Sequence, residues 1–170
     1  LKTRFLDAEK IPGCQVLVAR RGEVLYHYLG GLRDKERNSQ MTEDTVFRIY
    51  SMTKPITSVA LMTLFERGMF SLEDPVHRYI PEWSNLKVRS TGSYPDFQTI
   101  SCDRSMTVRD LLCHTSGLTY DFLNATNLDA AYRDLGVARP RPGYTLKDMI
   151  DQLSSLPLEF SPGTRWNYSI

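Results

Sequence analysis

The most apolar stretch of the chain runs from residue 55 to residue 66. Its only polar side chains before Glu66 are Thr57, Ser58 and Thr63. Apolar side chains recur at the three- and four-residue spacing of a helix and fill its remaining sides as well. The pattern predicts a buried helix that ends at Gly68, since glycine readily adopts the left-handed conformation found just after a helix.

Two runs of β-branched and aromatic residues precede this helix, at residues 15–19 and 23–29. The short polar link between them, residues 20–22, predicts an antiparallel hairpin. Both runs are more apolar than strict alternation would give, so we expect both faces of the hairpin to be partly covered. A hairpin followed by a long buried helix favours helices packed on a mostly antiparallel sheet.

Helix signals dominate the second half of the chain. Thr107 with Asp110, and Thr145 with Asp148, have the spacing of a capping box and predict helix starts. Residues 121–138 are expected to be helical without clear end signals. By contrast, the Ser-, Thr-, Gly-, Pro- and Asp-rich residues 83–106 predict a long loop.

Composition and charge narrow the function classes. The chain has 170 residues, of which 41% are hydrophobic and 24% charged, with a net charge of +1. These values are ordinary for a globular domain, and the near-zero charge disfavours nucleic acid or an anionic membrane as the main partner. No apolar run approaches the roughly 18 residues of a membrane-spanning helix. Oligomeric state stays open, as does the compartment, between the cytoplasm, which we favour, and the periplasm or the medium.

Metal and cofactor chemistry has little support in the sequence. The three histidines are scattered, and the three cysteines contain no Cys-x-x-Cys pair. Adjacent Cys113 and His114 would make a poor chelate without further donors. We therefore predict no metal site and no cofactor.

Ser51 and Lys54 carry the candidate chemistry. They lie three residues apart at the start of the apolar helix, so both side chains project from one face. A serine hydroxyl becomes a good nucleophile when a neighbouring base takes its proton, and a lysine amine can do so when burial favours its uncharged form. The plain alternative is a helix cap beside a solvated lysine. Pro55 disfavours a helical Lys54, which predicts a tightened first turn.

Three motifs in order resemble the serine β-lactamase-like superfamily. They are Ser-Met-Thr-Lys at residues 51–54, Met-Thr-Val-Arg-Asp-Leu-Leu-Cys-His-Thr-Ser-Gly-Leu at 106–118, and Pro-Gly-Thr-Arg-Trp-Asn-Tyr-Ser at 162–169. The likeness is greatest to the family VIII carboxylesterases, which are similar to class C β-lactamases in fold and catalytic residues. It extends from about residue 13 to residue 170.

The resemblance implies a mechanism and three catalytic residues. Ser51 matches the nucleophile, Lys54 the lysine that relays its proton, and Tyr168 the tyrosine that acts with the lysine as general base and later protonates the leaving group. The implied activity is that of a serine carboxylesterase on small, short-chain esters through an acyl-serine intermediate. The alternative for Tyr168 is an aromatic that packs under a loop.

The resemblance also implies an α+β fold, with a helical subdomain and an antiparallel sheet on which helices pack. Residues 1–170 would form the N-terminal portion of one β-lactamase-like domain. The hairpin and nucleophile helix would occupy about 11–68, and a mostly helical subdomain with long loops about 69–170. The family's C-terminal strands, with their Lys-Thr-Gly-like or His/Trp-x-Gly-like motif, have no counterpart here, so we expect an incomplete sheet and a fragment that is incomplete as a catalyst.

Two alternative functions stay open. Class C β-lactamases carry Asn at the third position of the tyrosine motif, where this chain has Ile170. That difference favours an ester over a lactam, with a β-lactamase or D-alanyl peptidase as the alternative. A catalytically silent binding or assembly protein of the same fold is the other. His114 and Ser116 could suggest a different hydrolase site, but we expect His114 to be a structural hydrogen-bonding residue, and no Gly-x-Ser-x-Gly surrounds Ser116.

Overall fold

The computed structural model describes residues 2–137, 139 and 141–170. It contains two compact units, Leu1–Thr53 and Lys54–Ile170. The boundary between them falls inside the predicted segment 11–68, and the predicted division of one domain near residue 68 stays a prediction.

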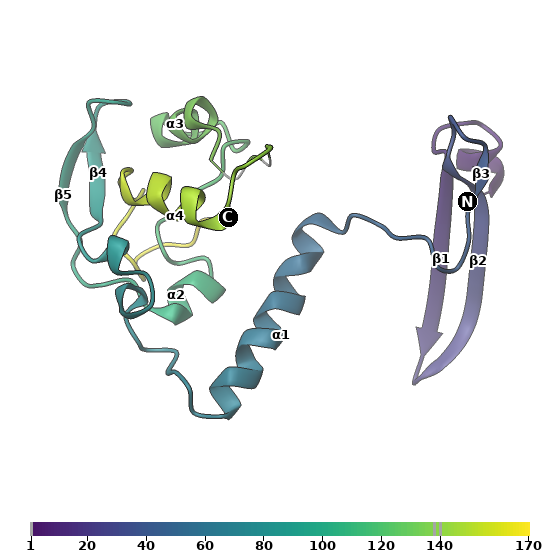
Figure 1. Ribbon diagram of the computed structural model, residues 1–170, viewed down its shortest axis with the longest axis horizontal. Helices are drawn as coiled ribbons and strands as arrows, with labels where there is room; N and C mark the ends of the chain where they lie inside the picture. The colour runs from purple at the N-terminus through teal and green to yellow at the C-terminus, as the bar shows by residue number, and fades with distance from the viewer. Residues whose placement is uncertain (1, 138, 140) are drawn as a thin grey trace. The chain divides into compact units, whose positions relative to one another are not determined.

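Unit 1 is built on an antiparallel hairpin (Figure 1). Strand β1 (Gly13–Arg20) pairs with β2 (Glu23–Asp34), and the short β3 (Ser39–Gln40) pairs with the end of β2. Arg21 and Gly22 form the two-residue turn, and both have positive φ angles, 54° and 85°. Such a turn matches the right-handed twist of the strands. The predicted hairpin is confirmed.

The predicted partial cover of the hairpin is present only near the start of β1, at residues 13–16, and is missing toward the turn. Apolar side chains along β1 and β2 are between 48% and 61% exposed: Leu17, Val18, Val24, Leu25 and Tyr26. In the described part of unit 1, the helical element that contacts β2 is the short π-helical turn Lys2–Leu6. A single turn cannot cover both faces of a strand pair of this length.

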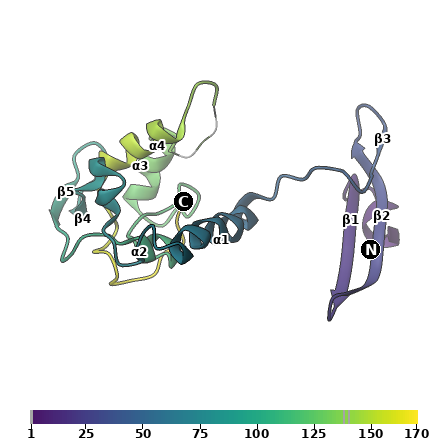
Figure 2. The same ribbon diagram turned by 60° about the horizontal axis from the view of Figure 1, so that its bottom comes forward.

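Unit 2 contains four α-helices, a second hairpin and two 3₁₀ turns among its described residues (Figure 2). Their bounds in chain order are α1 Thr53–Glu66, which begins one residue before the unit boundary, the 3₁₀ turns Val76–Arg78 and Pro81–Trp83, β4 Lys87–Thr91, β5 Gln98–Ser101, α2 Val108–Leu112, α3 Asn127–Leu135 and α4 Leu146–Ser154. None of the described helices is long and apolar enough to cross a membrane.

Helices α2, α3 and α4 all begin with the same device. The side chain of the N-cap threonine (Thr107, Thr126 or Thr145) accepts the N–H of an aspartate three residues later, and that aspartate accepts the threonine N–H in return. The predicted starts of α2 and α4 are therefore confirmed. The helix predicted over 121–138 is shorter, and Ala138 lies outside the described residues.

The long loop predicted over 83–106 was wrong, because β4 and β5 form an antiparallel hairpin within it. This hairpin is covered along β4 and not along β5: Val88 is buried, whereas its cross-strand partner Ile100 is 59% exposed. Val88 also forms a parallel bridge with Leu158, which joins the hairpin to the end of the chain. Short strands with mostly polar residues give little periodic signal.

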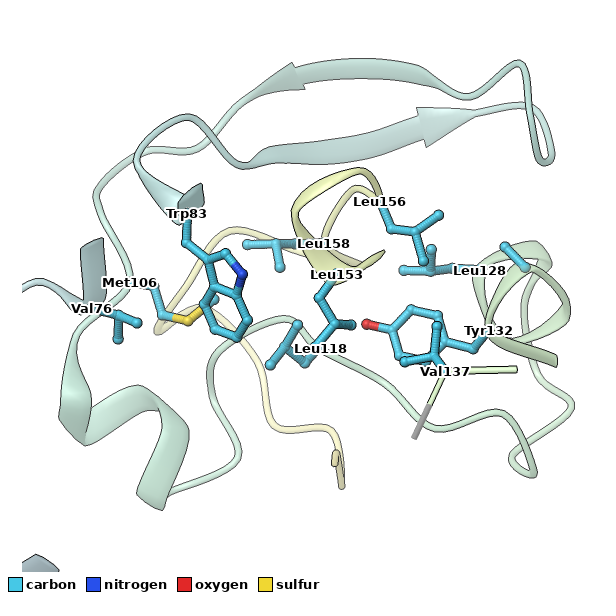
Figure 3. Packing of buried hydrophobic residues seen from close by; sticks show 11 residues of the cluster. Val76, Trp83, Met106, Leu118, Leu128, Tyr132, Val137, Leu153, Leu156 and Leu158 are labelled. Atoms are coloured by element: carbon cyan, nitrogen blue, oxygen red, sulfur yellow. The ribbon is translucent and has the colours of Figure 1, made fainter. Parts of the chain in front are cut away.

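The core of unit 2 is one continuous apolar cluster (Figure 3). Trp83, Met106 and Val76 lie at one end of it, and Leu128, Tyr132 and Val137 at the other, with leucines from α4 and the chain's last segment between them. The Trp83 indole N–H donates to the Ile150 carbonyl at 3.2 Å, so its polar atom is satisfied inside the cluster.

Helix α1 is not the buried helix that its composition predicts. It contains no buried residue, and Ile56 and Val59 are 61% and 66% exposed. Among the described residues no other element packs extensively along it. The tightened turn expected at its start is present as the 3₁₀ turn Tyr50–Met52, but the regular helix begins at Thr53 and includes Lys54, so the expectation that Pro55 keeps Lys54 out of the helix was wrong.

We expect the exposed side of α1 to make the isolated 170-residue chain associate. Replacing Ile56 and Val59 together with lysine should lower its binding of a hydrophobic dye and raise the fraction that stays monomeric, because the change removes exposed apolar surface. The Thr57→Lys variant, which adds charge to the same helix without removing an apolar side chain, is the control. Monomeric, cooperative melting of the unmodified chain, without dye binding, would contradict the expectation.

Candidate active site

Lys54 lies between two tyrosines contributed by distant parts of unit 2. Its Nζ donates a hydrogen bond to the Tyr120 hydroxyl at 2.9 Å. The same nitrogen lies 5.1 Å from the ring centre of Tyr120 and 5.1 Å from that of Tyr168. The two phenol rings stack with their centres 5.4 Å apart. The structure therefore brings together two of the three predicted catalytic residues and adds Tyr120 to them.

Ser51, the third predicted residue, belongs to unit 1 and is exposed in the turn Tyr50–Met52. Its meeting with Lys54 and Tyr168 is therefore a proposal and not an observation. The residue before it, Tyr50, has a φ of 45°, and the left-handed conformation is rare for a bulky side chain. Backbone strain of this kind collects at functional positions.

Residues 114–120 form a loop, and the last segment of the chain, residues 159–170, runs alongside it. Backbone N–H groups of the last segment donate to loop carbonyls at four points: Glu159 to Gly117 at 2.8 Å, Gly163 to Thr115 at 2.8 Å, Asn167 to His114 at 2.9 Å, and Ile170 to Thr119 at 3.4 Å. Gly117 has a φ of 88°, and a Cβ there would collide with the Phe160 carbonyl oxygen. The contact requires glycine and sets the position of the segment that carries Tyr168.

Asp110 anchors the first part of this loop. Arg104 donates to its two carboxylate oxygens at 2.6 and 2.9 Å, and the hydroxyl of Thr115 donates at 2.9 Å. The Asp110 side chain is only 4% exposed. Burial acts to raise the pKa of Asp110, but the hydrogen bonds from Arg104, Thr107 and Thr115 outweigh it and lower the pKa to about 2.

Asp129 anchors the other end of the loop. Its Oδ1 accepts a hydrogen bond from the Thr119 hydroxyl at 2.6 Å. Its Oδ2 accepts the backbone N–H groups of Ala125 and Thr126 at 2.7 and 3.0 Å. Because Thr119 directly precedes Tyr120, the carboxylate at the start of α3 sets the backbone that presents this phenol to Lys54.

The predicted role of His114 agrees with its surroundings. Its Nδ1 lies 3.2 Å from both the backbone nitrogen and the hydroxyl oxygen of Ser169, and its ring centre is 4.8 Å from that of Tyr168. Burial, together with the charge of Lys54, lowers the pKa of His114 below its ordinary value. The imidazole is therefore neutral near pH 7 and hydrogen bonds to the segment beside the candidate site.

Comparison with known proteins shows the family of the chain. The sequence matches the family described as Beta-lactamase over residues 3–170. The chain belongs to the β-lactamase family. Esterase EstB of Burkholderia gladioli is 37% identical over 170 residues, which is 97% of this chain and 39% of EstB.

Solved structures of the β-lactamase fold match as well. EstCE1, described as a hydrolase with promiscuous acyltransferase activity, has a TM-score of 0.79 at 28% identity, covering 96% of this chain and 40% of EstCE1. A class C β-lactamase mutant has a TM-score of 0.64 at 23% identity, covering 96% of this chain and 37% of that one, and shows the likeness of fold alone. The chain thus spans about 40% of the length of EstCE1, and the predicted incomplete α+β fold is confirmed.

Aromatic side chains at the edge of this candidate site are open to solvent. Phe122 is 57% exposed with its ring centre 4.7 Å from that of Tyr120, and Trp166 is 66% exposed with its ring edge-on to His114 at 6.1 Å. Phe122 and Trp166 do not belong to the core, and Tyr120 contacts Lys54 directly.

Sequence reasoning missed two parts of the site. The hydrogen bond from Thr119 to Asp129 was not predicted. The Thr-x-x-Asp spacing of Thr126 and Asp129 does signal the helix start at which Asp129 lies. The Lys54–Tyr120 hydrogen bond has no local signal, because a contact between residues so far apart depends on the fold. Among the described residues, no group of three or more His, Cys, Asp and Glu side chains is arranged to hold a metal ion.

We expect Asp110→Asn to lower the free energy of unfolding by about 2–3 kcal/mol, because it leaves Arg104 without its buried anionic partner. The pKa of Asp110 is lowered from 3.8 to about 2, so its contribution to stability is fully present above pH 3.8 and is lost as the pH falls toward 2. Urea unfolding at several pH values should therefore show the two proteins converging over that interval.

Asp148→Asn is the matched control, since Asp148 forms the same capping box at α4 but, among the described residues, accepts no hydrogen bond from an arginine. Its effect should be smaller. Equal losses for the two variants, or a difference between wild type and Asp110→Asn that persists at pH 2, would contradict the role given to the Arg104 pair.

Proposed function

We propose that the complete protein in which this sequence occurs is a serine carboxylesterase that acts on small, short-chain esters, with Ser51, Lys54 and Tyr168 as its catalytic residues. The observation that carries the proposal is the approach of Lys54 Nζ to the Tyr168 ring, at 5.1 Å from the ring centre. Two proton-carrying side chains meet there from distant parts of the sequence. Lys54, one of the two, follows Ser51 by three residues in the sequence.

In the proposed reaction the Ser51 oxygen attacks the ester carbonyl while its proton passes to the Lys54–Tyr168 pair. A positive charge beside a phenol stabilises the phenolate, which lets the pair act as a base. The tetrahedral oxyanion collapses to an acyl-serine, and the departing alcohol takes a proton from Tyr168. Water, activated in the same way, then releases the acid. In this scheme the backbone N–H groups at the start of α1 would favour negative charge near Ser51.

Tyr120 supports this assignment of Lys54. The hydrogen bond from Lys54 to the Tyr120 hydroxyl fixes the direction of a long, flexible side chain that would otherwise sample many rotamers. An amine that is already held in one position can exchange a proton with its neighbours without first losing the conformational entropy of its side chain.

The preference for an ester over a lactam is supported by Ile170. This side chain is partly buried against the core cluster, and its backbone N–H donates to Thr119. A lactam-hydrolysing relative would present an amide here to orient the lactam, and an aliphatic side chain cannot. The name of EstB, an esterase, points the same way, and EstCE1's described acyltransferase activity makes transfer of the acyl group to an alcohol an alternative second step.

The first test uses covalent labelling and turnover in the complete protein. Wild type should be labelled by a fluorophosphonate, and Ser51→Ala should abolish labelling and lower kcat for a chromogenic short-chain ester by several orders of magnitude. Lys54→Ala and Tyr168→Phe should cause losses approaching this size, because the three groups act as a unit.

Ser58→Ala, in α1 seven residues after Ser51, is the matched control and should keep its labelling and turnover. Absence of labelling in wild type would favour the silent binding or assembly protein. Retention of most activity by Tyr168→Phe would remove Tyr168 from the mechanism.

The second test compares substrates. We expect kcat/KM for the chromogenic ester to exceed that for a chromogenic cephalosporin in wild type, and Ile170→Asn to shift the ratio toward the lactam, because it restores an amide beside Tyr168. Lactam turnover without ester turnover in wild type would replace the carboxylesterase with a β-lactamase or peptidase.

A further inference from the structure

His114 is hydrogen bonded to both neighbours of Tyr168. The backbone N–H of Asn167 donates to the His114 carbonyl at 2.9 Å. On the other side of the tyrosine, the backbone N–H of Ser169 donates to the imidazole Nδ1 at 3.2 Å. The imidazole packs on the phenol between these two contacts, with ring centres 4.8 Å apart. One residue thus fixes the backbone before Tyr168, the backbone after it, and one face of its ring.

These contacts also determine the protonation of the imidazole. Nδ1 accepts from the Ser169 backbone, and the Ser169 hydroxyl lies at the same distance of 3.2 Å from it. Ser169 is only 1% exposed, so its N–H has no solvent to replace this acceptor. An imidazole that accepts at Nδ1 carries its proton at Nε2 when neutral.

We propose that His114 is the positioning residue for Tyr168, acting through its Nδ1 as the acceptor for the Ser169 N–H. The inference rests on the proposed function, since it assigns His114 a part in presenting the phenol to Lys54. His114 does not touch the substrate in this scheme.

The backbone of His114 is built for the role. Its φ of 58° lies in the left-handed region, which turns the chain so that carbonyl and imidazole both face the last segment. Asparagine tolerates this conformation better than most residues, and its Oδ1 stands the same number of bonds from Cα as the imidazole Nδ1. The hydroxyl of Thr115, the next residue, donates a hydrogen bond to Asp110, and this bond stabilises the turn.

The groups that face the imidazole make the arrangement sensitive to acid. Lys54 faces it from α1, and Tyr168 and Ser169 face it from the last segment, with Trp166 edge-on. Burial and the Lys54 charge lower the pKa of His114, so the acceptor is present at neutral pH and is lost as the pH falls through that lowered value. A protonated Nδ1 is a donor and would face the Ser169 N–H, which is also a donor, so the hydrogen bond between them would be lost.

The test compares His114→Asn with His114→Phe in the complete protein. Phenylalanine keeps the ring against Tyr168 and removes the acceptor, so kcat for the ester should fall about tenfold to a hundredfold with KM little changed. Asparagine keeps an acceptor that does not titrate. It should retain kcat within a few-fold of wild type and abolish the His114 inflection on the acid side of the kcat–pH profile. His77→Asn, outside the site, is the control and should leave that profile unchanged.

Two kinetic outcomes would overturn the inference. His114→Phe with wild-type kcat would show that Nδ1 is not needed, and His114→Asn as impaired as His114→Phe would show that the acceptor is not what matters. Fluorophosphonate labelling of wild type separates these failures from a failure of the proposed function, because an unlabelled wild type refutes the serine mechanism itself. Long-range ¹H–¹⁵N NMR of the imidazole gives a readout independent of activity: an Nε2–H tautomer supports the inference, and an Nδ1–H tautomer refutes it.

Discussion

Two buried carboxylates hold the loop on which the candidate site is built. Asp110 and Asp129 each complete a capping box at the start of a helix, and each also accepts a threonine hydroxyl from the loop 114–120. Hydrogen bonds to a buried charge are stronger than those between neutral groups. The starts of α2 and α3 and the two ends of the loop therefore share the same acceptors, and a shift of either helix start would be transmitted to the loop.

The same sequence device serves a different purpose in α4. Asp148 completes a capping box there, but the carboxylate is exposed and has no tie to the loop. The difference lies in what packs around the helix start, since only a buried carboxylate retains an acceptor site shielded from water for a distant hydroxyl. A local motif thus predicts where a helix begins, while burial decides whether the motif has a second role.

Sequence reasoning succeeded where the determining interactions are local. The hairpin turn at Arg21 and Gly22 and the capping boxes of α2 and α4 depend on residues a few positions apart, and these were predicted. The meeting of Lys54 with Tyr168 was expected from the family resemblance and from no spacing rule, and Tyr120 as the hydrogen-bond partner of Lys54 had no signal at all. Exposure of α1 was mispredicted because apolar composition shows that a helix needs a cover and does not show which segment supplies it.

The hydrogen bonds between residues 114–120 and 159–170 affect how the chain folds during its synthesis. The loop and the segment that completes it are separated by the whole of α3 and α4, so their hydrogen bonds are among the least local in the chain. Contacts of such large sequence separation form late, after the helices between them have condensed. During synthesis, Lys54 leaves the ribosome long before Tyr168 does, and the nascent chain must carry the amine without its phenol until translation reaches the last few codons of this sequence.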